Sequence, residues 1–186
     1  VIKDGEVVHN RCYGALKYDS SAAVSPNTMY DIASMTKVVA TTTAAMKLVE
    51  EGKLDLDRTV ASYIPAFGAN GKQNVTVRNL LVHNSGLTAF KLYYTFCRSG
   101  KEVLDSIYAS RLDYATGTRM VYSDLGIITL GKIVEAVAGI SLDVYAQAML
   151  FGPLGMAHTM FTPPEALRAL CAPTEMDTVW RKRLVQ

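Results

Sequence analysis

Cysteine is scarce in this chain, and its placement excludes two kinds of site. The 186 residues contain three cysteines, Cys12, Cys97 and Cys171. They are odd in number and widely spaced, so they form neither a metal-binding motif nor a disulfide framework. We therefore expect no metal, and no residue pattern points to a cofactor.

The chain also lacks an excess of charge of one sign and any long apolar run. Its 19 Lys and Arg residues against 17 Asp and Glu leave a net charge of +2, which does not favour nucleic acid or an anionic membrane surface as a partner. No apolar stretch is long and uninterrupted enough to span a bilayer. The composition, 49% hydrophobic and 19% charged, is that of one globular domain or part of a larger one.

An initiator methionine and a signal peptide are missing as well. The sequence opens in an apolar pair, Val1-Ile2, and both ends read as if they lay inside a domain. Because a leader could precede Val1, the sequence does not indicate a cellular compartment.

The pattern that carries chemistry is the tetrapeptide of residues 34–37, Ser-Met-Thr-Lys. At the start of a helix, this spacing places Ser34 and Lys37 on one face, one turn apart. That arrangement suits a nucleophile beside an amine base. A serine at a helix N-terminus also lies near N–H groups that can stabilise an oxyanion. On the tetrapeptide alone, an N-cap serine followed by a solvated lysine is the favoured interpretation.

The surroundings of the tetrapeptide favour the catalytic interpretation. Residues 29–33 and 38–49 are mostly apolar, so Lys37 is expected near the start of a helix, residues 34–51, that is apolar nearly all round. A lysine in such a place is costly, and burial there can lower its pKa. Residues 122–124, Tyr-Ser-Asp, supply the phenol that such a site would use.

One hairpin and a series of helices are expected around this motif. The hairpin occupies residues 1–15 and turns at Asp4-Gly5. Further helices are expected over residues 77–82, 101–112 and 125–138, with another after Ser141. Beyond Pro163-Pro164 the pattern loosens. A single hairpin is too little sheet to be stable alone, so the fold needs more strands than the chain shows.

His83 allows two interpretations. It is followed by Asn, Ser and Gly, which is typical of a loop residue with local hydrogen bonds. A catalytic pair of serine and histidine is the alternative, and it is the less favoured one.

Four motifs follow one another along most of the chain, from about residue 29 to residue 160. They are residues 32–37 (Ile-Ala-Ser-Met-Thr-Lys), residues 80–87 (Leu-Leu-Val-His-Asn-Ser-Gly-Leu), Gly117 followed by residues 122–124, and residues 153–156 (Pro-Leu-Gly-Met). In this order they resemble the serine beta-lactamase and penicillin-binding protein superfamily, most of all class C beta-lactamases and beta-lactamase-type esterases. Each motif alone is weak, but the set is specific. Ser-x-x-Lys is also the signature of class A enzymes, whose base is disputed.

The resemblance implies an α+β fold. An antiparallel sheet flanked by helices would pack against an all-helical region, with the active site between them. Residues 1–28 would form the first hairpin and loop of the sheet region. Residues 29–160 would form the helical region, and residues 161–186 would begin the return to the sheet. The resemblance also favours a periplasmic or secreted protein.

The resemblance assigns roles to five residues. Ser34 would be the acylated nucleophile, and Lys37 and Tyr122 the proton-transfer pair. Ser123 and Asp124 would bind substrate or support the site. The oxyanion hole would use the N–H of Ser34 and a second N–H from a late edge strand.

Two departures from the family pattern matter. Class C beta-lactamases usually carry Asn where this chain has Asp124. A carboxylate near Lys37 would favour the ammonium form and oppose its use as a base, or Asp124 simply helps to start the following helix. The third family motif, Lys-Thr-Gly or His-x-Gly on a strand beside the serine, has no match. We expect this motif in a missing C-terminal part of the same domain, in the same chain or a second one. Residues 1–186 would then form the first half to two-thirds of the family domain.

Two functions of different classes are consistent with these residues. The first is a serine hydrolase that cleaves an ester or amide, including a beta-lactam or a peptidoglycan peptide, through a Ser34 acyl-enzyme. Asp124 argues slightly against an efficient lactamase. The alternative is a non-catalytic binding or accessory module on the same fold. The absent third motif supports the module, and the intact Ser34, Lys37 and Tyr122 oppose it.

Overall fold

The computed structural model describes residues 1–17, 22–177 and 183–185. The chain divides into two compact units. One unit joins the two ends of the chain, Val1–Ala33 and His158–Gln186, and the other is the continuous segment Ser34–Ala157. All five candidate site residues lie in the second unit.

The predicted hairpin opens the first unit. Strands β1 (Ile2–Lys3) and β2 (Glu6–Val7) pair antiparallel. Asp4 and Gly5 connect them with φ values of +52° and +83°. Positive φ at both central positions is the requirement of a type I′ turn, and an Asp-Gly pair meets it at low cost. The hairpin is therefore confirmed, although its strands are shorter than the predicted segment.

A second pair of strands lies near the other end of this unit, in the segment 161–186 that was expected to begin the return to the sheet, although no particular strand was predicted there. Strands β3 (Glu175–Asp177) and β4 (Arg183–Val185) pair antiparallel. Strands this short are difficult to find in a sequence, because three residues are too few to show a period-two pattern. The described strands form two two-stranded sheets. The broad antiparallel sheet that the family resemblance implies is therefore not present in the described part of the chain.

The remainder of the first unit is mostly irregular. It includes the short helix α7 (Glu165–Arg168). Met29 and Cys171 form a parallel bridge. The N–H of Met29 donates to the carbonyl of Leu170 at 2.8 Å, and its carbonyl accepts from the N–H of Ala172 at 2.8 Å. These bonds join the segment that leads toward Ser34 to the segment after α7.

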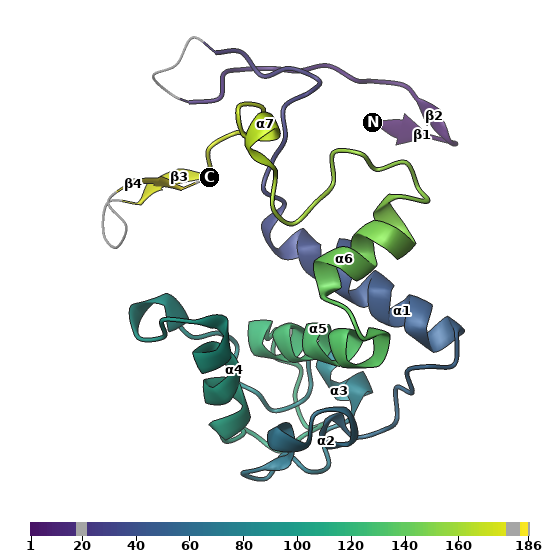
Figure 1. The fold of residues 1–186 in the computed structure, drawn as a ribbon, viewed down its shortest axis with the longest axis vertical. Helices are drawn as coiled ribbons and strands as arrows, with labels where there is room; N and C mark the ends of the chain where they lie inside the picture. The colour runs from purple at the N-terminus through teal and green to yellow at the C-terminus, as the bar shows by residue number, and fades with distance from the viewer. Residues whose placement is uncertain (18–21, 178–182, 186) are drawn as a thin grey trace. The chain divides into compact units, whose positions relative to one another are not determined.

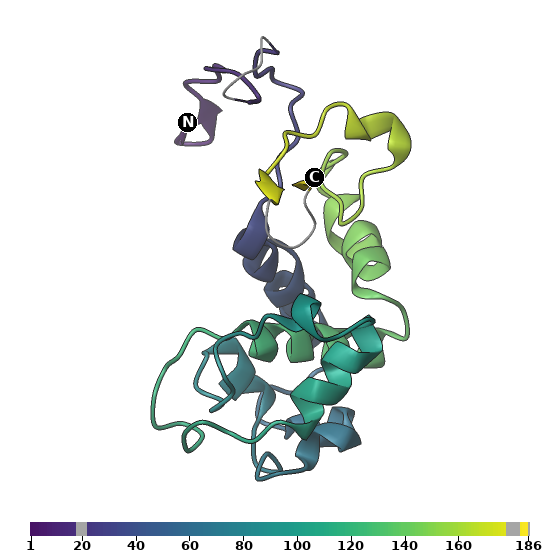
Figure 2. The same cartoon turned by 90° about the vertical axis from the view of Figure 1, so that its left-hand side faces the viewer.

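The helical unit is organised around α5 (Asp124–Ala138). This helix packs against α1 (Thr43–Glu50), α2 (Val60–Tyr63), α3 (Val77–Leu81) and α6 (Leu142–Ala146) (Figure 1). Figure 2 shows α6 alongside α1 from a second direction, in agreement with their contacts. Further helical segments include α4 (Gly100–Ala109), the 3-10 turns Pro65–Gly68 and Tyr93–Thr95, and the π-helix Gln147–Phe151.

The ends of these helices follow from local sequence. The hydroxyl of Thr76 accepts the N–H of Asn79, and the Asn79 side chain accepts the N–H of Thr76, so α3 begins in a reciprocal capping box. Ser99 caps α4 by accepting the N–H of Glu102 at 3.2 Å. Gly139 ends α5 with φ +74°. The helices predicted over residues 77–82, 101–112 and 125–138 are thus present, with bounds shifted by a few residues at most.

The helix that carries Ser34 and Lys37 changes its winding along its length. A 3-10 turn (Ala33–Met35) is followed by a π-helical stretch (Lys37–Thr42) and then by α1. The prediction for residues 34–51 was one uniform helix. The run of threonines, a poor helix former, lies where the π-helix passes into α1. There the hydroxyl of Thr43 donates to the carbonyl of Val38 at 2.7 Å.

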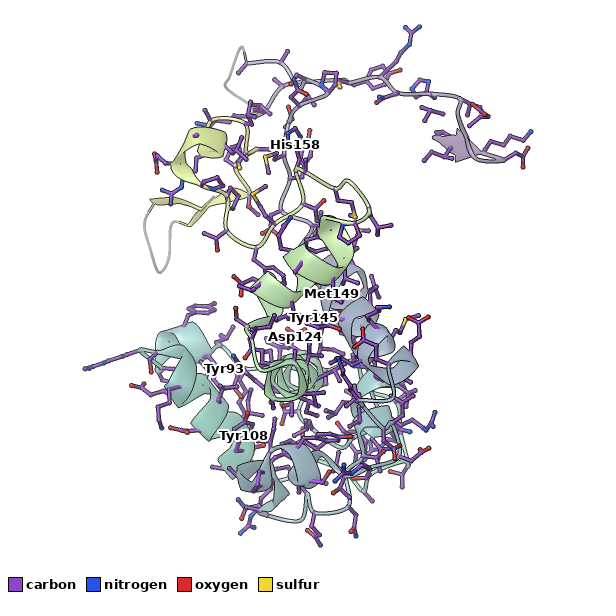
Figure 3. The ribbon with its side chains drawn as sticks, turned by 45° about the vertical axis from the view of Figure 1, so that its right-hand side comes forward. Tyr93, Tyr108, Asp124, Tyr145, Met149 and His158 are labelled. Atoms are coloured by element: carbon purple, nitrogen blue, oxygen red, sulfur yellow. The ribbon has the colours of Figure 1, made fainter. Side chains whose placement is uncertain are left out.

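The core of the helical unit surrounds α5. In Figure 3, α5 is seen nearly end-on, with Tyr108 from α4 and Tyr145 from α6 around it. Its buried face is mainly apolar and includes Leu130, Ile133 and Val134, each with no exposed surface. No single helix among the described residues is long and apolar enough to cross a membrane. Only α5 and Leu142–Phe151 taken together, bent by 73°, meet the length and composition for a span.

Candidate active site

The amine of Lys37 is the centre of the candidate site. Its Nζ donates to Oγ of Ser34 at 2.8 Å. The same Nζ lies 2.8 Å from Oδ1 of Asp124 and 4.9 Å from the ring centroid of Tyr122. The Lys37 side chain is 16% exposed. One amine thus contacts three of the other four residues that the sequence singled out.

The backbone just before Ser34 is held in an uncommon conformation. Ala33 has φ +46°, a region that non-glycine residues rarely adopt. The carboxylate of Asp31 accepts the N–H of Ala33 at 2.7 Å. Such strain is of order 1–3 kcal/mol per residue and tends to occur at functional sites. Ser34 follows in the first helical turn, where N–H groups lack intrahelical acceptors, as the sequence predicted.

The pKa values of Lys37 and Tyr122 are shifted by the groups that surround them. Partial burial lowers the pKa of Lys37, but the hydrogen bonds to Asp124 and Tyr122 outweigh it, and the pKa is raised. Of the two opposing effects that the sequence suggested for Lys37, burial and a nearby carboxylate, the carboxylate, together with Tyr122, prevails. Hydrogen bonds from Ser34 and then Lys37 lower the pKa of Tyr122. The arrangement favours an ammonium at Lys37 and eases formation of a phenolate at Tyr122.

Asp124 combines the two roles that the sequence left open. It is the first residue of α5, where a carboxylate interacts favourably with the helix dipole. Its N–H donates to the carbonyl of Ala89 at 2.7 Å. The carboxylate, in a side chain that is 46% exposed, forms the ion pair with Lys37. Asp124 thus starts the helix and places a negative charge in the site.

Ser123 supports the site from inside the protein. It is 1% exposed. Its hydroxyl donates to the carbonyl of Thr88 at 2.8 Å and accepts the N–H of Gly126 at 3.2 Å. These bonds cap α5 and join it to the segment after His83. The Ser123 hydroxyl is therefore buried and engaged in two hydrogen bonds within the protein.

His83 is the residue near the site whose place the sequence did not predict. Its Nδ1 accepts the N–H of Ser123 at 3.1 Å. Its ring lies against the Tyr122 ring, with centroids 4.7 Å apart and planes at 41°. His83 contacts Tyr122, and no described hydrogen bond joins it to Ser34. The only sequence signal was its position in residues 80–87, one of the four motifs.

The described residues contain no cluster of side chains that suits a metal ion. Within residues 1–17, 22–177 and 183–185, no group of three or more His, Cys, Asp or Glu side chains could hold a metal ion. The three cysteines are free.

The sequence matches the Beta-lactamase family over residues 1–185, and the chain belongs to that family. It is 38% identical over 183 aligned residues to an N-acetylmuramyl-L-alanine amidase of Bacillus subtilis (strain 168). It is 36% identical over 183 residues to a putative D-alanyl-D-alanine carboxypeptidase of Escherichia coli (strain K12). Each alignment covers 88% of this chain and 42% of the relative. The chain thus spans less than half the length of these curated relatives.

Solved structures agree with the family assignment. A class C beta-lactamase in complex with cefoxitin matches with a TM-score of 0.79 and 27% identity, over 94% of this chain and 48% of that one. The D-alanine carboxypeptidase AmpC from Burkholderia cenocepacia matches with a TM-score of 0.77 and 26% identity, over 94% and 46%. The predicted resemblance is confirmed. The fold is beta-lactamase-like, mostly helical in the described residues, and corresponds to roughly half of a class C chain.

Proposed function

We propose that the protein is a serine hydrolase in which Ser34 forms an acyl-enzyme with an ester or amide substrate. The observation that carries this proposal is the contact of Lys37 Nζ with Ser34 Oγ at 2.8 Å, in a site that also contains Tyr122. A nucleophile beside a cation and a phenol of lowered pKa is suited to acyl transfer.

Acylation would use Tyr122 as the base. Ser34 Oγ attacks the carbonyl carbon while its proton passes to the phenolate oxygen of Tyr122. Lys37, whose pKa is raised, remains an ammonium and stabilises the phenolate and the developing oxyanion. When the tetrahedral intermediate collapses, Tyr122 returns the proton to the leaving oxygen or nitrogen. Water then attacks the acyl-enzyme, with Tyr122 as base again, and Ser34 regains its proton.

A D-alanyl peptide of peptidoglycan is the substrate that we favour. Support comes from the relatives named as D-alanyl-D-alanine carboxypeptidases. Beta-lactams would then act as acylating analogues, since a class C relative has been solved with cefoxitin. The alternative, a non-catalytic binding module, offers no reason for Ser34, Lys37 and Tyr122 to be in mutual contact.

Mass spectrometry of the full-length protein tests this proposal. Incubation with a labelled penicillin or a fluorophosphonate should add one acyl group to the wild type and none to Ser34→Ala. Turnover should fall by about 10³-fold or more in that variant. Ser62→Ala, which alters an exposed serine whose hydroxyl donates to Thr59, is the matched control and should be acylated normally. An adduct that persists in Ser34→Ala, or a folded wild type that resists both probes, contradicts the proposal.

Three substrates separate the classes within the proposal. Release of D-alanine from a D-Ala-D-Ala peptide indicates a carboxypeptidase, cleavage of a short-chain nitrophenyl ester indicates an esterase, and nitrocefin turnover indicates a beta-lactamase. We expect D-alanine release to be the activity that falls most in Ser34→Ala.

A further inference from the structure

His83 holds the segment around Tyr122 through three separate contacts. Its carbonyl accepts the N–H of Val121 at 2.8 Å. Its imidazole ring lies against the ring of Tyr122. Its Nδ1 accepts the N–H of Ser123 at 3.1 Å. One residue thus contacts three consecutive residues, and the candidate base is the middle one.

The contact with His83 restrains Tyr122, whose side chain is exposed. It is 51% exposed. An exposed aromatic ring retains rotameric freedom, and a base that moves by about 1 Å can lose about 10²-fold in rate. The His83 ring lies against Tyr122 at a tilt of 41°, and Lys37 lies over the Tyr122 ring with its Nζ 4.9 Å from the centroid.

We propose that His83 is a positioning residue for Tyr122: its neutral imidazole fixes the tyrosine in reach of Ser34, and protonation of Nδ1 releases it. This inference rests on the proposed acyl transfer at Ser34. His83 does not touch the reacting atoms in this role. It acts through the orientation of Tyr122.

The hydrogen bond itself requires a neutral imidazole. A backbone N–H can donate to Nδ1 only when that nitrogen carries no proton, so His83 must be the tautomer protonated at Nε2. Burial and then the charge of Lys37 lower the pKa of His83, while the charge of Asp124 acts in the opposite direction. The charged and titratable groups that face it are Lys37, Asp124 and Tyr122. The lowered pKa keeps the imidazole neutral near pH 7 and places the release of Tyr122 on the acid side.

The loop that carries His83 has other bonds, so its imidazole can be replaced without dissolving the loop. The carbonyl of Asn84 accepts the N–H of Gly117 at 2.8 Å. The carbonyl of Ser85 accepts from the Thr116 hydroxyl, also at 2.8 Å. The bonds of Ser123 and Asp124 to residues 88–89 add to these. None of them uses the His83 side chain.

Two substitutions separate the hydrogen bond from the bulk of the ring. In His83→Asn, Oδ1 can take the place of Nδ1 as acceptor, and asparagine suits the backbone φ of +56° at this position. His83→Leu has a similar branched shape but offers no acceptor. We expect acylation within about threefold of wild type for His83→Asn, and a loss of roughly 10- to 100-fold for His83→Leu. Thermal unfolding of both variants shows whether each is folded.

The pH profile distinguishes positioning from a merely structural role. In the wild type, acylation should fall on acidification in two steps, one as the Tyr122 phenolate is protonated and one as His83 is protonated. In His83→Asn the step that belongs to His83 should be absent, because the residue no longer titrates. His158→Asn, an exposed histidine, is the matched control and should leave the profile unchanged. NMR of ¹⁵N-labelled histidine should show Nδ1 of His83 unprotonated at neutral pH.

The outcomes are separable from those of the proposed function. A wild type that is never acylated at Ser34 overturns the acyl transfer, and with it this inference. If Ser34 is acylated but His83→Leu and His83→Asn react at equal rates, the positioning role alone is wrong. It is equally wrong if the acid limb of His83→Asn coincides with that of the wild type.

Discussion

Lys37 and Asp124 form an ion pair, with Nζ of the lysine 2.8 Å from Oδ1 of the aspartate. Because the Asp124 side chain is about half exposed, such a pair adds little to stability. Its effect is on the charge of the site. The carboxylate, through its hydrogen bond and its charge, helps to raise the pKa of Lys37. A lysine held as an ammonium is a poor proton acceptor, which leaves Tyr122 as the candidate base.

Replacement of Asp124 by asparagine should shift the pH dependence of acylation while retaining most of the activity. Loss of the carboxylate lowers the pKa of Lys37, which the hydrogen bond and charge of Asp124 raise. It also lowers the pKa of Tyr122, because the charge of Asp124 opposes the phenolate. The acid limb of the rate profile that Tyr122 sets and the alkaline limb that Lys37 sets should therefore both move to lower pH. The rate at pH 7 should stay within about tenfold, or roughly 1.4 kcal/mol in barrier.

Asp105→Asn is the matched control for this substitution. It removes the carboxylate of another Lys–Asp pair, in which Nζ of Lys101 lies 2.7 Å from Oδ2 of Asp105 on α4. The rate and pH dependence of acylation should be unchanged in Asp105→Asn. An Asp124→Asn loss far above tenfold would mean that the negative charge is itself required.

Lys37 and Tyr122 should behave as one unit in a double-mutant cycle. Lys37→Ala removes the cation that favours the phenolate, and Tyr122→Phe removes the phenol. Each single change should nearly abolish acylation, and the double variant should be little slower than either. Burst-phase acylation with a chromogenic substrate measures this. Tyr63→Phe, which removes a hydroxyl that accepts the N–H of Asp55, should combine multiplicatively with Lys37→Ala. Multiplicative losses for Lys37 and Tyr122 would indicate independent roles.

Gly86 should tolerate a side chain far less well than Gly71. Both have φ near +90°, at +93° and +88°, so alanine at either position meets a backbone cost of about 1–2 kcal/mol. A Cβ at Gly86 would lie 2.4 Å from the carbonyl oxygen of Tyr114, while at Gly71 it would meet nothing within 4 Å. We expect Gly86→Ala to lower the free energy of unfolding well beyond Gly71→Ala in urea titrations. Equal losses would show that the loop after His83 moves easily.

Lys72 should make the stability of the protein depend on pH. Its side chain is fully buried, and Nζ donates to the carbonyl of Ser110. Burial lowers the pKa of Lys72 below its value in the unfolded chain. Between these two pKa values the unfolded state binds more protons, so the free energy of unfolding rises with pH across that window. Urea titrations should show this slope in the wild type and a smaller one in Lys72→Met.

Lys91→Met is the matched control, because Lys91 is exposed. It should retain the wild-type slope. If Lys72→Met also retains that slope, Lys72 is not the source of the pH dependence.

The sequence by itself determined the features that depend on neighbours along the chain. The spacing of Ser34 and Lys37 placed them on one face, since a helical turn brings such residues together, and the apolar segments on either side favoured their contact. Asp4-Gly5 marked a hairpin, because turns are formed by adjacent residues. The strands of the second hairpin were not predicted individually, because segments of three residues are too short to show the alternation of apolar and polar residues that is typical of a strand.

The sequence suggested two opposing effects on the pKa of Lys37, burial and a nearby carboxylate, and only the tertiary structure decided which one prevails. Burial of Lys37 was predictable from its apolar surroundings, and burial alone would have lowered its pKa. The opposing contribution comes from Asp124 at the start of α5, a different element of the fold. The contact of His83 with Ser123 likewise joins residues separated by 40 positions. Such distances depend on how α3 and α5 pack, and no local pattern encodes them because Coulomb interactions act through space and not along the chain.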